Sequence, residues 1–332
     1  MVGTSSPSRI VHEAPATLWV FDQPAGTVAL TAPANGATNR PRRPTLEWAA
    51  ASQGGSYHLQ VATDPDLVTL AIDESGIDGT TFTPGSHLNA STEYWWRVRA
   101  SNACGDGAWS EVRSFTTEPR PGECGPGTAP MIHFEDDFES GAPGWTHSGI
   151  RDSWALDDTP IDPPPPSGSW VFHADDSPSV TDQRLVSPSI VLPPADQAPI
   201  TLEYWNYQSI EASSGGCYDG GILEVSTNGG TTWTQLTPVP DTDPYDGMVS
   251  ANYGNPLAGL HAWCGRPRDW DEAVFNLDAF AAQTVQFRFR LGTDSSVGHN
   301  GWDIDGVVVQ SCVPSEPGLL FRRIRERLRP RT

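Results

Sequence analysis

The strongest constraint on the fold is a repeated pattern of short stretches in which apolar and polar residues alternate between turn-forming residues. Thr45–Trp48, Tyr57–Val61 and Tyr94–Ala100 follow this pattern early in the chain. Alternation places apolar side chains on one face of a strand. No long stretch has the apolar period of a helix, and 32 Gly and 31 Pro are spread between the stretches. The sequence therefore predicts an all-β protein.

Similar stretches continue in the second half of the chain. They are Ile200–Tyr207, Gly221–Ser226, Val285–Leu291 and Trp302–Val309. Each would bury one face, which implies two packed sheets. Asn228 and Gly229 separate two such stretches and predict a hairpin turn.

A chain of 332 residues is long enough for two domains that each bury a core. A Pro- and Gly-rich segment at 118–127 marks a boundary between them. The expected parts are 1–27 as a linker or the end of an upstream region, 28–118 as a first sandwich, 119–130 as a linker, 131–313 as a larger sandwich, and 314–332 as a disordered tail. This tail holds six Arg and two Glu, and an amphipathic anchor is the alternative interpretation.

The charge excludes one class of partner. Forty-one acidic residues against 20 basic ones give a net charge of −21, which repels phosphates and anionic membranes. We therefore expect no nucleic-acid partner. The sequence contains no apolar run of 18 residues, so no transmembrane segment is predicted. The acidity has two interpretations, which are solubility in an extracellular medium and carboxylates gathered for calcium.

Five cysteines without a C-x-x-C motif favour disulfides in an oxidising compartment over a metal site. Secretion is therefore expected, although the first residues lack the pattern of a signal peptide. Any one of the five can be left out, and the other four can then pair in three ways, so fifteen arrangements are possible. We expect Cys217 to pair with Cys264, and Cys124 with Cys312, because the latter two bracket the second domain. Cys104 then lies outside both pairs, as a thiol or bonded to a segment outside this chain.

The first domain resembles fibronectin type III domains. The matching residues are Leu88 to Tyr94, Arg99 to Asn102 and Gly105 to Ser110, within a region of about 90 residues. The resemblance implies that Trp48 is the core tryptophan and that Tyr94 ties a loop to the backbone. The fold alone does not assign a role, because this sandwich serves many. We expect a spacer and not a dedicated ligand-binding domain.

The second domain resembles the jelly-roll domains appended to bacterial secreted peptidases of the immune inhibitor A type, and more distantly MAM domains. The matching pieces are Asp137–Gly141, Leu185–Pro188, Tyr218–Ser226, Phe287–Asp294 and Gly301–Asp305. The resemblance implies a MAM-like or galactose-binding-like sandwich. In those families the domain is accessory, so binding or stabilisation is expected and chemistry is not.

Jelly rolls of this general kind often hold calcium where their first and last strands meet. Calcium needs six to eight oxygen ligands, which carboxylates and carbonyls supply. The candidate ligands are Asp136, Asp137 and Glu139 at the first strand, Asp303 and Asp305 on the last strand, and Asp175 and Asp176 after the stretch at 170–173. The alternative is that these are solvated acids near strand ends.

Several aromatic residues are candidates for stacking on sugar rings. They are Trp205, Tyr207, Tyr245, Tyr253 and Trp263. The segment 241–263, rich in Tyr, Asn, Asp and Gly, is the best candidate for a ligand surface. The alternative is that these rings pack in the core.

The sequence carries no recognised catalytic signature. The chain has no G-x-S-x-G elbow, no phosphate-binding glycine loop and no dinucleotide fingerprint. We therefore expect no enzymatic activity from this chain.

The leading hypothesis is a spacer and binding region of a secreted bacterial peptidase or other hydrolase, whose catalytic domain lies upstream. The alternatives are an independent, calcium-dependent carbohydrate-binding or adhesion protein, and an unrecognised hydrolase in the second domain; glycans and protein ligands are the expected partners.

Overall fold

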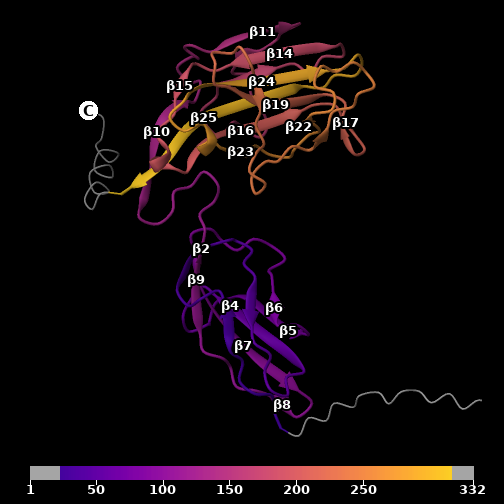
Figure 1. The fold of residues 1–332 in the computed structure, drawn as a ribbon. Coiled ribbons are helices and arrows are strands. Elements are labelled where there is room, and N and C mark those ends of the chain that lie inside the picture. Colours follow the sequence, from indigo (N-terminus) through magenta and orange to yellow (C-terminus); the bar gives the residue numbers. More distant parts are fainter. Residues whose placement is uncertain (1–22, 316–332) are drawn as a thin grey trace, which may run out of the picture. The chain divides into compact units, whose positions relative to one another are not determined.

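Alternating sequence stretches form strands throughout residues 23–315, which are the residues that the computed structural model describes (Figure 1). Two units divide between Glu118 and Pro119. The prediction of an all-β protein is confirmed, because the helical residues are confined to two short 3-10 turns, η1 (Ala195–Gln197) and η2 (Asp278–Phe280). No helix in the described part is long and apolar enough to cross a membrane. The expectations for residues 1–22 and 316–332 lie outside the described residues.

The first unit is a sandwich of two sheets. One sheet contains β1 (Leu30–Ala32), β3 (Leu46–Trp48) and β6 (Thr81–Phe82). The other has the order β2 (Ala37–Arg40), β9 (Arg113–Thr117), β7 (Glu93–Asn102), β4 (Ser56–Ala62) and β5 (Leu70–Ile77), and β8 (Gly105–Asp106) is added to β7.

Two aromatic residues organise the core of this sandwich. Trp48 is buried, and its ring lies 5.5 Å from that of Tyr57. Tyr94 is buried against Phe115, and its hydroxyl accepts a hydrogen bond from the backbone N–H of Asn89 at 3.0 Å. The hydroxyl therefore ties the preceding loop to strand β7, and the roles expected for Trp48 and Tyr94 are confirmed.

The second unit is a sandwich of two six-stranded antiparallel sheets, which we name after their central strands. The β16 sheet has the order β12 (Ala155–Asp157), β13 (Val171–Ala174), β25 (Gly301–Pro314), β16 (Ile200–Ser209) and β23 (Asp271–Asn276), with β10 (Thr128–Asp136) added to β25. The β24 sheet has the order β11 (Thr146–Ile150), β14 (Thr181–Val186), β24 (Thr284–Thr293), β19 (Gly220–Ser226) and β20 (Thr234–Gln235), with β15 (Ile190–Val191) added to β24. Two hairpins, β17 (Ala212–Ser213) with β18 (Gly216–Cys217) and β21 (Gly247–Met248) with β22 (His261–Ala262), lie outside these sheets.

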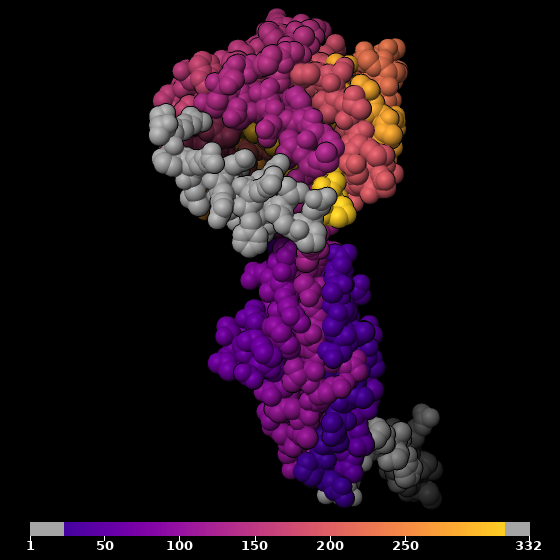
Figure 2. Space-filling view, turned by 90° about the vertical axis from the view of Figure 1, so that its left-hand side faces the viewer, coloured from indigo at the N-terminus to yellow at the C-terminus, as the bar shows by residue number. Residues whose placement is uncertain are grey.

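Aromatic side chains from both sheets meet between them. Tyr204 of β16, Phe289 of β24 and Trp302 of β25 are buried. The ring centroids of Tyr204 and Phe289 are 4.9 Å apart, and those of Phe289 and Trp302 are 5.9 Å apart. In the space-filling view, the magenta and yellow segments of this unit lie side by side although they are far apart in sequence (Figure 2). The expected second sandwich is therefore confirmed.

Two disulfides hold the second unit, and they are the two pairs expected from the sequence. Cys124 is bonded to Cys312 across 188 residues, and Cys217 to Cys264 across 47 residues. Cys104 is exposed and belongs to neither pair. The first bond joins the segment before β10 to the end of β25, beside the pairing of these two strands.

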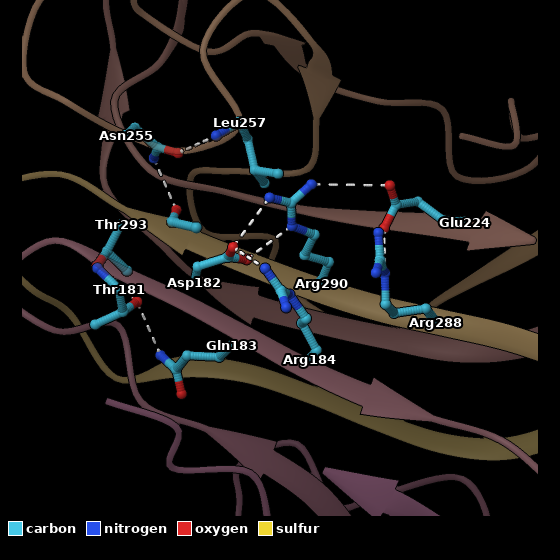
Figure 3. A network of polar contacts seen from close by, with 11 residues as sticks. Thr181, Asp182, Gln183, Arg184, Glu224, Asn255, Leu257, Arg288, Arg290 and Thr293 are labelled. Atoms are coloured by element: carbon cyan, nitrogen blue, oxygen red, sulfur yellow. Dashed lines mark hydrogen bonds and ion pairs between the residues drawn. The ribbon is translucent and has the colours of Figure 1, made fainter. Parts of the chain in front are cut away.

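The outer face of the β24 sheet carries a row of paired charges (Figure 3). Asp182 accepts hydrogen bonds from Arg184 and from Arg290, whose Nε lies 2.7 Å from Oδ1. Glu224 accepts one from Arg288 Nε at 2.6 Å. The charges in this row therefore satisfy one another.

Candidate metal centre

Four acidic side chains converge at one end of the second sandwich. Asp176 follows β13 and Glu211 follows β16, whereas Asp219 precedes β19 and Asp294 follows β24. The four therefore come from loops of both sheets, and we call them the acidic cluster. One carboxylate oxygen each of Glu211, Asp219 and Asp294 lies within 4.8 Å of the others, and no other trio of acids, histidines or cysteines in residues 23–315 meets this criterion.

Backbone groups hold these carboxylates in place. Asp176 Oδ2 accepts hydrogen bonds from the N–H groups of Glu211, at 3.1 Å, and His299, at 3.0 Å. Asp219 Oδ1 accepts one from the N–H of Asp294 at 2.5 Å. Each bond links one loop of the cluster to another, so the positions of the acids depend on one another.

Asn255 supports the cluster from the segment between β21 and β22. Its Nδ2 donates to the carbonyls of Tyr218, at 2.9 Å, and Gly292, at 2.8 Å, while its Oδ1 accepts from the N–H of Leu257 (Figure 3). These two carbonyls lie one residue before Asp219 and two residues before Asp294. The buried amide therefore positions the chain at two of the four acids.

The remaining oxygens of three cluster acids are buried, and none of them accepts a hydrogen bond from an N–H or hydroxyl group. They are Asp176 Oδ1, Glu211 Oε2 and Asp219 Oδ2. The carboxyl groups of Asp176 and Asp219 face each other and need a shared proton or a cation between them. Asp219 is 0% exposed and Asp176 is 3% exposed. Burying a carboxylate oxygen without a compensating contact is costly. Three such oxygens in one cluster indicate a place for a group that carries positive charge.

The raised pKa values of the cluster acids also favour a positively charged group at this place. Burial, followed by the neighbouring Asp176 carboxyl, raises the pKa of Asp219. Burial also raises the pKa of Asp176, and burial together with Asp294 and Asp176 raises the pKa of Glu211. The cluster therefore favours a bound proton or cation over four free negative charges. Its donors are all oxygens, which suits a hard cation such as calcium and not zinc.

Of the metal ligands predicted from the sequence, only Asp176 belongs to the cluster. Asp303 bonds His173 Nδ1 at 2.7 Å, and Asp305 accepts hydrogen bonds from the N–H and hydroxyl of Ser167. The two acids do share one side of β25, but that side faces a histidine and a loop. Asp175 is exposed on the surface. Asp175, Asp303 and Asp305 therefore lie outside the acidic cluster, and their role as metal ligands stays a prediction.

The acids at the first strand also lie elsewhere. Asp136 accepts hydrogen bonds from Trp145 Nε1 and the N–H of Phe138, so it stabilises a local turn. Asp137 accepts from the N–H of Glu139, whose own carboxylate binds the backbone at 169–170. Asp136, Asp137 and Glu139 thus lie outside the acidic cluster. Their oxygens bind the backbone and Trp145, and their role as metal ligands stays a prediction.

The sequence contained a signal for two of the missed acids. Asp219 lies in the run Tyr218–Ser226, and Asp294 ends the run Phe287–Asp294, and both runs carry the resemblance to accessory jelly rolls. Each acid adjoins a strand end, where loop ligands gather. Glu211 follows β16 with no comparable signal.

The predicted aromatic ligand surface is only partly at the surface. Trp263 is 0% exposed in the core, and Tyr245 packs against it with ring centroids 4.4 Å apart. Tyr207 is buried beside Trp270. The ligand role predicted for Trp263 was wrong, because its ring has no exposed surface, whereas the roles of Tyr207, which is 9% exposed, and of the half-buried Tyr245 stay predictions. Trp205 lines a cavity, and Tyr253 is 48% exposed.

Part of the chain matches a known family. Residues 34–119 match the model of the "Rha78A-like, N-terminal immunoglobulin domain". The first unit is thus immunoglobulin-like, and the narrower fibronectin type III and MAM assignments stay predictions.

Other proteins share parts of the chain's sequence or fold. Bacillopeptidase F of Bacillus subtilis (strain 168) is 24% identical over 180 residues, which are 53% of this chain and 10% of that protein. A solved structure of carbohydrate-binding modules from the β-sandwich superfamily is 14% identical, covers 87% of this chain and 98% of its own, and superposes with a TM-score of 0.32. The structure of TmCBM61 with β-1,4-galactotriose is 10% identical, covers 56% and 99%, and has a TM-score of 0.34. At these TM-scores neither superposition carries a functional argument.

Proposed function

We propose that the second unit binds one calcium ion at the acidic cluster, and that the chain is a non-catalytic accessory region of a secreted bacterial peptidase or other hydrolase. The observation that carries the calcium site is the set of three buried, unpartnered carboxylate oxygens on Asp176, Glu211 and Asp219. Together with Asp294 they offer four carboxylates from four loops.

Calcium suits this donor set better than magnesium. Calcium accepts six to eight oxygens in irregular geometry, whereas magnesium demands a near-ideal octahedron and keeps several waters. Three of the four carboxylates, those of Asp176, Asp219 and Asp294, are buried, which leaves little room for such waters. When bound, the ion supplies the positive charge that these carboxylates lack. The residues themselves join loops of the two sheets, so the proposed role is to stabilise the sandwich.

Three observations support the accessory role. Two disulfides suit an oxidising compartment, which favours secretion. The sequence has no recognised catalytic motif. The chain spans only about a tenth of Bacillopeptidase F, a peptidase by name, so it corresponds to a small part of such a protein. The identity of the host, as a peptidase or another hydrolase, belongs to the proposal.

Calcium titration tests the metal site directly. Metal-free protein is expected to bind calcium in a 1:1 ratio by isothermal titration calorimetry, and magnesium more weakly. Asp219→Asn is expected to weaken calcium binding by about tenfold or more, because it removes a buried charged ligand. Asp175→Asn, which changes the adjacent exposed acid to the same amide, serves as the matched control. Absence of binding, or equal binding by Asp219→Asn, would refute the site.

An activity screen tests the accessory role. The purified chain is expected to hydrolyse neither casein nor a panel of chromogenic glycosides, with or without calcium. Turnover that follows the protein through purification and disappears on a single acid-to-amide substitution would identify a hydrolase instead. This outcome would leave the calcium site intact, so the two parts of the proposal are tested separately.

A further inference from the structure

The outer face of the β16 sheet contains a cavity of about 590 Å³ that the acidic cluster does not share. Its lining includes Glu135, Asp136, Asp137, Ser167, Trp205 and Gly306. Strands β10, β25 and β16 form its base, since Glu135 pairs with Val308 in the ladder and Trp205 pairs with Asp305. This volume lies within the usual range for sites that bind small ligands.

Trp205 is held as a platform in this cavity. Gly306, in the left-handed region with φ of 55°, lies opposite the indole, and a Cβ atom there would be 3.1 Å from Trp205 Cδ1. Glycine therefore allows the indole to lie against the backbone of β25. The ring also packs against the buried pair of Tyr207 and Trp270. A ring fixed in this way presents apolar area at little entropic cost.

The walls of the cavity present mainly hydrogen-bond acceptors. Asp136 is oriented by Trp145 Nε1 at 2.8 Å and by the N–H of Phe138 at 3.0 Å. Asp137 is oriented by the N–H of Glu139, and Glu135 adds a third carboxylate. The hydroxyl of Ser167 donates to Asp305, which leaves its oxygen as an acceptor. Among the lining residues there is no Arg, so the cavity repels ligands that carry carboxylate, sulfate or phosphate groups.

We propose that this cavity binds uncharged or amino sugars of a glycan, with one ring stacked on Trp205 and its hydroxyls donating to Glu135, Asp136 and Asp137. A sugar ring has both features that the cavity matches, because its C–H face packs on an indole and its hydroxyls donate to oriented acceptors. A basic peptide would use the carboxylates and could also stack an arginine on the indole, so a tetra-arginine peptide is the competing ligand in the test. Binding does not require calcium, because no residue of the acidic cluster lines the cavity. The inference therefore stands apart from the proposed calcium site.

Titration with defined oligosaccharides tests this site. The probes are hexaoses of β-1,4-linked glucose, mannose and galactose, a chitosan hexaose, an oligogalacturonate as the anionic counterpart, and a tetra-arginine peptide. At least one uncharged or amino hexaose is expected to bind by calorimetry and to change tryptophan fluorescence, whereas the oligogalacturonate does not bind. Chelator is expected to leave this binding unchanged at 10 °C, provided that circular dichroism shows the protein folded.

Variants assign the binding to the cavity. Trp205→Ala is expected to lower affinity about tenfold or more, since it removes the stacked ring. Glu135→Gln changes a strand position on the cavity wall and is expected to lower affinity without disturbing the Trp205 platform. This second variant tests the site even if Trp205→Ala fails to fold. Trp233→Ala, which removes a tryptophan that lies under Arg288 of the β24 sheet and outside the cavity, leaves affinity unchanged. The proposal is overturned if no hexaose binds, if only the peptide binds, or if Glu135→Gln and a folded Trp205→Ala bind as well as the parent protein.

Discussion

Chelation of calcium is expected to lower the melting temperature of the second unit by about 5 to 10 °C. An ion that binds only the folded state stabilises it by about 2.7 kcal/mol when its free concentration is about 100 times Kd. For a unit of about 200 residues, each kcal/mol corresponds to about 2 to 4 °C. Without the ion, the unpartnered oxygens of Asp176, Glu211 and Asp219 oppose one another in a buried space. Differential scanning calorimetry with calcium and with EGTA measures the difference.

The Asp219→Asn variant gives this experiment its sharpest control. The amide removes one buried charge, so in EGTA the variant is expected to melt at the temperature of the parent protein or above it. In calcium it is expected to melt below the parent, because the ion has lost a ligand. Asp175→Asn should keep the full response to calcium. An equal calcium shift in parent and Asp219→Asn would mean that calcium acts at another place.

Loss of the bond between Cys124 and Cys312 is expected to destabilise the second unit by about 5 kcal/mol. The bond closes a loop across 188 residues, and in the chain-entropy model the stabilisation grows with the logarithm of loop length. The shorter loop between Cys217 and Cys264 spans 47 residues, for which the same model gives about 4 kcal/mol. Urea unfolding of the two Cys→Ser double variants, followed by circular dichroism, measures both values.

A third cysteine provides the control for this comparison. Cys104 is exposed, so Cys104→Ser is expected to shift the unfolding free energy of either unit by no more than about 0.5 kcal/mol. A reversal of the order of the two disulfides, with the shorter loop costing more, would mean that strain or residual structure dominates over chain entropy. An unchanged urea midpoint in the Cys124→Ser, Cys312→Ser variant would contradict the prediction.

Local patterns in the sequence predicted most of the fold. Alternation at Ile200–Tyr207 and Val285–Leu291 was sufficient to place β16 and β24, because a strand with one buried face repeats every two residues. Asn228 and Gly229 do lie in the turn between β19 and β20. These features depend only on neighbours in sequence.

The metal site could not be predicted in the same way. Asp303 and Asp305 were correctly placed on one side of a strand, but sequence cannot say that His173 and Ser167 occupy that side. The acidic cluster depends on how two sheets pack, because its acids come from loops of both sheets. Similarly, Trp263 lies in a segment with the composition of a surface loop, yet the β21–β22 hairpin carries it into the core.

The disulfide between Cys124 and Cys312 also determines how the second unit responds to mechanical load. β10 and the part of β25 before Cys312 lie between these cysteines along the chain, and the two strands pair antiparallel to each other. A pull applied before Cys124 and after Cys312 travels through one covalent bond and bypasses the sandwich. Tension along the oxidised chain then leaves the cation cluster and the sugar cavity undistorted, whereas in the reduced chain the same tension would peel β10 and β25 apart.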